Sequence, residues 1–236
     1  MDIAVFGANG PTGRLLTRQA LRAGHVVTAL TRHPDAFPDR HDRITVMACD
    51  VYDLVAVERA VRGRDAVLST LGTPYSRKPI TLYSVGMANI IRAMKHHAVR
   101  RLVCVSSSAT DPTERRRDTG GGFFFEKVLK PVIMGTVGRS LYADMLRMET
   151  LVAASDLDWT IVRPSGLFAT PEVTDYRTAE GFIAGRYTSR QDLADLLLRQ
   201  ADDDRYRRKA VAVATFGAQP SVLQLIRSEA FQHGGR

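Results

Sequence analysis

Cysteine is scarce in this chain, and long apolar segments are missing. Its 236 residues include two cysteines, Cys49 and Cys104, each in or beside an apolar, strand-like run. We interpret them as buried, reduced thiols rather than as a disulfide or a metal pair. No Cys/His cluster has the spacing of metal ligands, so we expect no bound metal. No apolar run approaches the roughly 20 residues that span a bilayer, so we expect no membrane segment.

Several other signatures are absent as well. The sequence has neither a G-x-S-x-G nucleophile elbow nor a P-loop, which argues against hydrolase, kinase and ATPase functions. Its first residues resemble a folded strand carrying the acidic Asp2 rather than a signal peptide, so we expect a cytoplasmic protein. Either a monomer or a homodimer is compatible with the sequence.

Positive charge is in excess, with a formal net charge of +8. The arginines are dispersed along the chain, and the densest cluster, Arg115 to Arg117, has no interleaved aromatic residues. We therefore expect no nucleic-acid binding and a small molecule as the partner. The cluster itself is either a solvated face or a surface that attracts an anionic substrate.

Strand-like and helix-like patterns alternate from the first residue. The strand-like runs are 2–6, 25–31, 43–49, 65–71, 101–107, 157–164 and 209–215, and helical patterns cover 11–24, 53–63, 79–97, 140–155 and 185–200, with a final short helix after residue 215. Such alternation predicts a parallel sheet of about seven strands, covered by helices on both faces. We predict an α/β, doubly wound Rossmann-type single domain over residues 1–236, with substrate-cleft elements at about 107–140 and 165–236.

The first strand-to-helix connection contains the stretch GANGPTG, Gly7 to Gly13. In this context, exposed backbone N–H groups and the positive helix end can bind a pyrophosphate. We predict that Gly7 allows the tight turn, Gly10 the approach of the pyrophosphate, and Gly13 close packing of helix and strand. Pro11 suits the first helical turn, and Asn9 and Thr12 can add side-chain hydrogen bonds.

The end of the second strand selects the cofactor in a dinucleotide fold. An NAD site places an acidic residue there to hold the ribose hydroxyls, whereas this sequence has Arg32, flanked by Thr31 and His33. A guanidinium suits a 2′-phosphate through bidentate, charge-assisted hydrogen bonds. We therefore predict NADP(H) rather than NAD(H).

Two further strand ends are candidates for cofactor contacts. Asp50 and Val51 follow the third strand. In one interpretation they border the adenine, and in the other Asp50 caps the next helix. Thr70, Leu71 and Gly72 end the fourth strand, where Gly72 either lets the chain pass close to the cofactor or belongs to a plain turn.

Several segments in chain order resemble the atypical short-chain dehydrogenase/reductase superfamily, in particular NAD(P)H-binding proteins similar to biliverdin reductase B (flavin reductase) and the NmrA-like proteins. The segments that carry the resemblance are GANGPTG, TRHPDAF, CDVYD, DAVLSTLGT, GMANIIRAMKHHAVRRLVCVSSSA and MLRMETLVAASDLDWTIVRPSGL. The late segment GRYTSRQDLAD is similar to the one that returns to the sheet in this family.

The resemblance implies roles for two clusters. In the flavin-reductase-like proteins, a serine at the end of the fifth strand lies by the nicotinamide. That alignment points to Ser107, and an alignment to sugar epimerases points to Ser108. Ser106 and Ser107 are also expected to contact the cofactor. The step Arg163-Pro164-Ser165 would lie beside the nicotinamide.

One position departs from the superfamily pattern. Short-chain dehydrogenases usually carry Tyr-x-x-x-Lys on the helix after the fifth strand, but here Leu146 follows Tyr142 at the lysine position. Tyr142 is therefore either a catalytic acid without its lysine or an ordinary residue of an amphipathic helix. The flavin-reductase-like proteins also lack this pair, so hydride transfer stays compatible with its absence.

Other aromatic residues are open to two interpretations. Phe123 to Phe125 follow a glycine run and either start a helix or form a lid over a flat substrate. Trp159, on the sixth strand, is interpreted as a core residue.

The sequence as a whole predicts an NADPH-dependent oxidoreductase with a ketone, quinone, flavin or tetrapyrrole-like acceptor. The alternatives are an NmrA-like regulator that senses NADP(H) without turnover, and an isomerase or lyase of the same superfamily.

Overall fold

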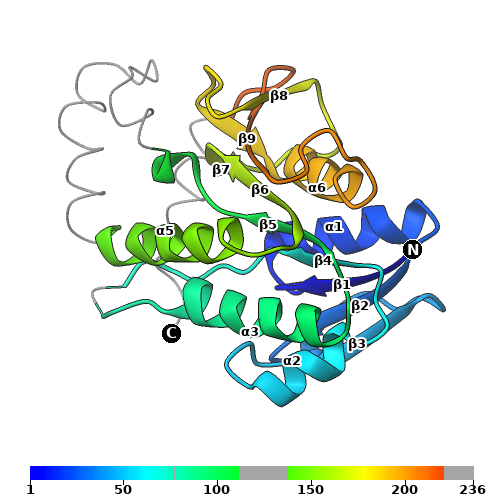
Figure 1. The fold of residues 1–236 in the computed structure, drawn as a ribbon. Helices are drawn as coiled ribbons and strands as arrows, with labels where there is room; N and C mark the ends of the chain where they lie inside the picture. Colours follow the sequence, from blue (N-terminus) through cyan, green and yellow to red (C-terminus); the bar gives the residue numbers. More distant parts are fainter. Residues whose placement is uncertain (77, 112–137, 221–236) are drawn as a thin grey trace.

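The computed structural model describes residues 1–76, 78–111 and 138–220. Its middle layer is an eight-stranded sheet with the strand order β3-β2-β1-β4-β5-β6-β10-β8 (Figure 1). The strands are β1 (Asp2–Phe6), β2 (Val26–Thr31), β3 (Ile44–Ala48), β4 (Ala66–Ser69), β5 (Arg101–Val105), β6 (Asp158–Pro164), β8 (Tyr176–Glu180) and β10 (Lys209–Thr215). The order β3-β2-β1-β4-β5-β6 is that of a doubly wound Rossmann sheet, which confirms the predicted fold class.

The composition of the central strands explains their place in the sheet. All four residues of β4 are buried, as are the last four of β1 and the last five of β2. Continuous apolar runs of this kind suit strands that are covered on both faces. Trp159 and Cys104 lie in the same core, and Cys49 is buried at the end of β3, as expected.

Helices cover both faces of the sheet (Figure 1). On one face, α1 (Pro11–Arg22) packs against α6 (Arg190–Arg199) over one apolar cluster. On the other face, α2 (Leu54–Val61), α3 (Leu82–His96) and α5 (Arg139–Ala153) enclose a second cluster. The predicted two-faced cover is therefore confirmed, and no described helix has the length and apolar character needed to cross a bilayer.

Two helix starts differ from the expectation. The α2 cap is Asp53, whose carboxylate accepts from the N–H groups of Val55 (2.9 Å) and Ala56 (3.3 Å), so the alternative in which Asp50 caps this helix is wrong. Helix α3 begins at Leu82 rather than near Pro79, because Ile80 donates its N–H to the Ser140 side chain (2.8 Å) instead of entering the helix.

The C-terminal part adds strands that the sequence patterns did not indicate. Strand β8 pairs antiparallel with β10, so the expected all-parallel sheet has one antiparallel edge. Strands β7 (Gly166–Phe168) and β9 (Tyr187–Ser189) form a separate parallel pair. The predictions for Arg115 to Arg117, for Phe123 to Phe125 and for a helix beyond residue 220 lie outside the described residues.

Candidate functional site: the carboxyl edge of the sheet

The predicted cofactor residues lie along one edge of the sheet. Because the strands from β3 to β10 run parallel, their carboxyl ends share that edge. The segments at this edge are Gly7–Gly13, Thr31–His33, Asp50–Val51, Thr70–Gly72, Ser106–Ser108 and Arg163–Ser165. The connections reverse direction between β1 and β4, and ligands of doubly wound sheets bind in the crevice at such a point.

The glycine turn between β1 and α1 is tightly packed. Gly7 has a φ of +75°, and a Cβ there would lie 2.7 Å from the carbonyl oxygen of Thr70. A Cβ on Gly13 would lie 2.2 Å from the Gly7 oxygen, so only glycine lets α1 start this close to the turn. At Gly10 the corresponding distance is 3.2 Å, so internal packing restricts this position less than the other two.

The first turn of α1 has no side-chain cap among the described residues. Its cap position is Gly10, and the turn contains no acidic residue. Asn9 does not act as a cap, because its Oδ1 accepts from Nε of Arg14 (2.9 Å). Orphan N–H groups at an uncapped helix start can bind an anion, and this chain leaves the start of α1 in that state.

Arg32 follows β2 and is exposed. Across the residues that the structure describes, its guanidinium has no ion pair or side-chain hydrogen bond. The neighbouring Thr31 is buried, and its Oγ1 accepts from the N–H of His33 (3.2 Å), which shapes the chain just after the strand. Arg32 is thus held at the strand end with its charge available to a ligand.

The segments after β3 and β4 differ in how firmly they are bound. Asp50 accepts from the N–H of Tyr52 (3.0 Å), and the Val51 oxygen accepts from Nδ2 of Asn89 (2.8 Å). Thr70 Oγ1 donates to the Phe6 oxygen (3.0 Å) and lies 3.2 Å from the Gly7 oxygen, which joins the end of β4 to the glycine turn. A Cβ on Gly72 would meet no atom within 4 Å.

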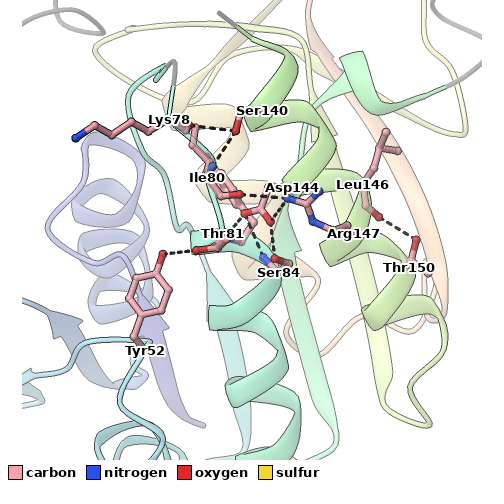
Figure 2. A network of polar contacts seen from close by, with 11 residues as sticks. Tyr52, Lys78, Ile80, Thr81, Ser84, Ser140, Asp144, Leu146, Arg147 and Thr150 are labelled. Atoms are coloured by element: carbon pink, nitrogen blue, oxygen red, sulfur yellow. Dashed lines mark hydrogen bonds and ion pairs between the residues drawn. The ribbon is translucent and has the colours of Figure 1, made fainter.

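Helix α5 holds the connection between β4 and α3 through a polar network (Figure 2). Asp144 is fully buried, and its carboxylate accepts from the N–H of Tyr83 (2.8 Å) and from Oγ of Ser84 (2.5 Å). It thereby caps α3 from a neighbouring helix. Arg147 adds a hydrogen bond to the Ile80 oxygen (3.2 Å). Burial raises the pKa of the Tyr83 hydroxyl, which lies outside these hydrogen bonds, to about 12.

Tyr142 lies on α5 near this network. Its hydroxyl is 3.0 Å from that of Tyr75, with the two rings edge to face, and Tyr75 belongs to the same β4–α3 connection. Leu146, at the position of the family's lysine, is 37% exposed and provides no charge to the tyrosine. The tyrosine of the superfamily pair is thus present as Tyr142 and contacts Tyr75, while Leu146 replaces the lysine.

The serines after β5 have different surroundings. Ser106 is buried, and its Oγ has no partner among the described residues. Ser107 caps the 3-10 turn η2 (Ser108–Thr110), accepting from the N–H of Ala109 (3.2 Å). Ser108 lines a pocket together with Asp111, Arg163 and Ser165. Of the two alternatives, Ser108 is therefore the serine that lines the pocket.

Arg163 is bound by two carboxylates. Its guanidinium donates to both carboxylate oxygens of Glu149 (3.0 and 2.6 Å) and lies 3.2 Å from Oδ2 of Asp111. The Glu149 carboxylate also accepts from Oγ1 of Thr110 (2.7 Å), which fixes the η2 turn that carries Ser108. Arg163 thus organises part of the pocket lining, which also includes the apolar side chains of Phe182 and Ile183.

Several of these residues were not predicted from the sequence. Glu149, Asp111 and Tyr75 meet their partners only through the packing of separate elements, so no local pattern marks them. Arg190, the first residue of α6, donates to Oγ1 of Thr12 at the start of α1 (3.4 Å). In the sequence, its position after Ser189 indicates the start of a helix but does not indicate a binding role.

A second cluster lies away from this edge. Ligand atoms of Glu58, His96 and His97 come within 4.8 Å of one another near the carboxyl ends of α2 and α3. Helices α2 and α3 run back across the sheet from its carboxyl edge, so the cluster lies at the opposite end from the candidate site.

The fold and the carboxyl edge define this chain as a Rossmann-type NAD(P)-binding α/β protein. It belongs to the NAD(P)H-binding family, whose model matches residues 7–204. This confirms the resemblance to the atypical short-chain dehydrogenase/reductases, and a nicotinamide cofactor is the ligand of the family.

Curated relatives and solved structures agree with this assignment. An uncharacterized protein of Mycobacterium tuberculosis is 39% identical over 108 residues, which span 45% of this chain but only 12% of that protein. A Bacillus subtilis protein described as an uncharacterized sugar epimerase is 25% identical, and the match covers 89% of this chain and 92% of that protein. A short-chain dehydrogenase/reductase of Veillonella parvula, solved in complex with NADP, matches with a TM-score of 0.73 and 21% identity, over 93% of this chain and 98% of that chain. At that identity the last match shows the fold alone.

Proposed function

We propose that this chain is an NADPH-dependent oxidoreductase that transfers a hydride to a small conjugated or carbonyl acceptor, such as a ketone, quinone, flavin or tetrapyrrole-like molecule. The observation that carries the proposal is the uncapped start of α1, built on a turn that only glycine fits, together with Arg32 at the end of β2, which has no acidic partner among the described residues. Both features suit an anionic dinucleotide. The cofactor supplies the hydride, and the protein binds and orients the reactants.

The preference for NADPH rests on Arg32. Its exposed guanidinium follows β2, where NAD-binding chains have an acidic residue. A 2′-phosphate offers the oxygens that a guanidinium binds in bidentate fashion, whereas a 2′-hydroxyl does not. The hydrogen bond from the His33 N–H to Oγ1 of Thr31 shapes the turn that carries Arg32.

The acceptor is proposed to bind in the pocket at the ends of β5 and β6. Ser108, on the pocket wall, can donate a hydrogen bond to a carbonyl oxygen of the acceptor. The apolar side chains of Phe182 and Ile183 suit a flat, conjugated molecule. Water is proposed to supply the proton, since Arg163 is committed to carboxylates and Leu146 occupies the position of the family's lysine, four residues after Tyr142.

The test is a pair of fluorescence titrations, with NADPH and with NADH, followed by turnover assays with ketone, quinone and flavin acceptors. We expect tighter binding of NADPH than of NADH. The variant Arg32→Ala should reduce the ratio of the two affinities by about 10-fold or more, which is the effect of losing a charge-assisted hydrogen bond. An Arg40→Ala variant is a matched control, because Arg40 is also exposed and bonds only backbone oxygens in the same connection. Equal binding of the two nucleotides by the wild type would refute the NADPH preference.

A second candidate function has its own observation. An NmrA-like sensor would bind NADP(H) without turnover, and Leu146 in place of lysine favours it because the tyrosine loses its usual activation. Binding of NADPH without consumption by any acceptor of the panel would favour the sensor. Product formation without net consumption of the nucleotide would favour an isomerase or lyase.

A further inference from the structure

Arg190 combines partial burial with a lack of acidic partners among the described residues. It is partly buried at the first position of α6, and burial lowers the pKa of its guanidinium. In the described part of the chain, its side chain makes one hydrogen bond, the 3.4 Å contact to Oγ1 of Thr12, and no ion pair. A cation withdrawn from water is costly unless an anion or several acceptors compensate it.

The other buried arginines show what compensation looks like in this protein. Arg101 donates to the Gln200 oxygen (2.7 Å), the Asp158 oxygen (2.6 Å) and Oγ1 of Thr160 (2.8 Å). Arg163 is held by two carboxylates. Arg190 has nothing comparable among the described residues, where its side chain is a cation without a counter-ion.

Nearby carboxylates do not fill this role. Asp192, in the same helical turn, is fully buried and accepts from Thr174 through its N–H (2.7 Å) and Oγ1 (2.9 Å), and from the Thr215 hydroxyl. Asp195, one turn further on, is bound by Arg199 (2.6 Å) and Tyr176 (2.5 Å).

The position of Arg190 is set by rigid neighbours. Ser189 is fully buried, caps α6 by accepting from the N–H of Asp192 (3.1 Å), and donates its own N–H to Thr215 (2.8 Å). The next residue, Gln191, accepts from Nε2 of Gln19 on α1 (2.8 Å), so the start of α6 is fastened to α1 (Figure 1). From this anchored start, the guanidinium reaches Thr12, the second residue of α1.

Thr12 lies in the uncapped first turn of α1, which follows the glycine turn. We propose that Arg190 binds the pyrophosphate of the nicotinamide dinucleotide, adding a cation from α6 to the N–H groups at the start of α1. This inference rests on the nicotinamide cofactor of the proposed function, but not on the preference for NADPH or on hydride transfer. It makes α6 part of the cofactor site, since the bound pyrophosphate then joins α6 to α1.

The test is the variant Arg190→Met, which removes the charge and keeps a long side chain. We expect it to weaken NADPH and NADH by the same factor, about 10- to 100-fold, because both contain the pyrophosphate. This pattern differs from that of Arg32→Ala, which should affect NADPH alone. Arg190→Lys should retain part of the affinity. Arg199→Met, on the same helix but exposed and paired with Asp195, should leave both affinities unchanged.

The melting temperature without nucleotide separates this role from a structural one. Removing an uncompensated buried cation should leave it unchanged or raise it, whereas removing a structural contact should lower it. Loss of NADPH binding alone would place Arg190 at the 2′-phosphate and overturn the inference, as would unchanged affinities or a lower melting temperature without nucleotide. If the wild type preferred NADH, the NADPH proposal would fail while equal losses in Arg190→Met would still support this inference. A wild type that binds neither nucleotide would overturn both.

Discussion

The variant Glu149→Gln tests whether the ion pair with Arg163 supports the pocket. The Glu149 and Arg163 side chains are only 9% and 14% exposed, so losing the carboxylate leaves a largely buried guanidinium with Asp111 as its one described anionic partner. Breaking a buried pair costs about 3–5 kcal/mol, and we expect the lower end, about 3 kcal/mol, because Asp111 stays in place. For a domain of this size, that corresponds to a fall in melting temperature of about 6–12 °C.

Thermal unfolding followed by circular dichroism measures this effect. The matched control is Glu180→Gln, which breaks an exposed pair with Lys209 and should cost at most about 1 kcal/mol. The double variant Glu149→Met with Arg163→Met should lose less than the sum of the two single variants, because no charge is then left unpaired. A change below about 2 °C in Glu149→Gln would refute the assignment of this pair as a support of the pocket wall.

Three further changes probe the turn, the helix and a buried thiol. Gly13→Ala should abolish nucleotide binding and cost about 1–3 kcal/mol in a denaturant titration, because its Cβ would lie 2.2 Å from the Gly7 oxygen; retained binding would contradict the packing argument. Tyr142→Phe should change the turnover rate by less than about 3-fold if water supplies the proton, whereas a loss of about 100-fold or more would make Tyr142 the acid. Burial raises the pKa of Cys49 from 9.0 to about 11, so the stability it contributes as a neutral thiol is complete below pH 9 and is lost as the pH rises toward 11. Urea titrations at pH 8 and 10.5 should show a smaller alkaline loss in Cys49→Ala than in the wild type, and equal losses would contradict this.

Local signals in the sequence predicted the cofactor end of the fold well. The glycine turn and the Pro11 start of α1 depend on residues within a few positions of one another, and the structure has both where expected. The helix cap at Asp53 was missed although it directly precedes the apolar run of α2, because Asp50 offered a similar side chain three residues earlier. A choice between two nearby caps depends on the backbone conformation, which the residue types alone do not determine.

Long-range pairings escaped prediction for a different reason. Strands β7 and β9 have three residues each, too few to show a periodic pattern, and they form by pairing with each other across an interval of about 20 residues. The antiparallel β8 has no fully buried residue, and its direction is set by its pairing with β10. The contacts of Glu149 with Arg163 and Thr110 likewise arise only after α5, β6 and η2 have packed together.

The contrast between Arg163 and Arg190 shows why burial alone does not identify a binding residue. Arg163 lies near the carboxyl end of β6 and Arg190 directly follows β9, and the sequence-based interpretation assigned the cofactor contact to Arg163. The structure gives Arg163 two carboxylates, which neutralise it within the protein, and gives Arg190 a single hydroxyl beside an uncapped helix. A compensated cation gains little from an added anion, whereas an uncompensated one recovers its desolvation cost when the anion binds. Arg190 is therefore the arginine whose charge is best placed to serve the ligand rather than the fold.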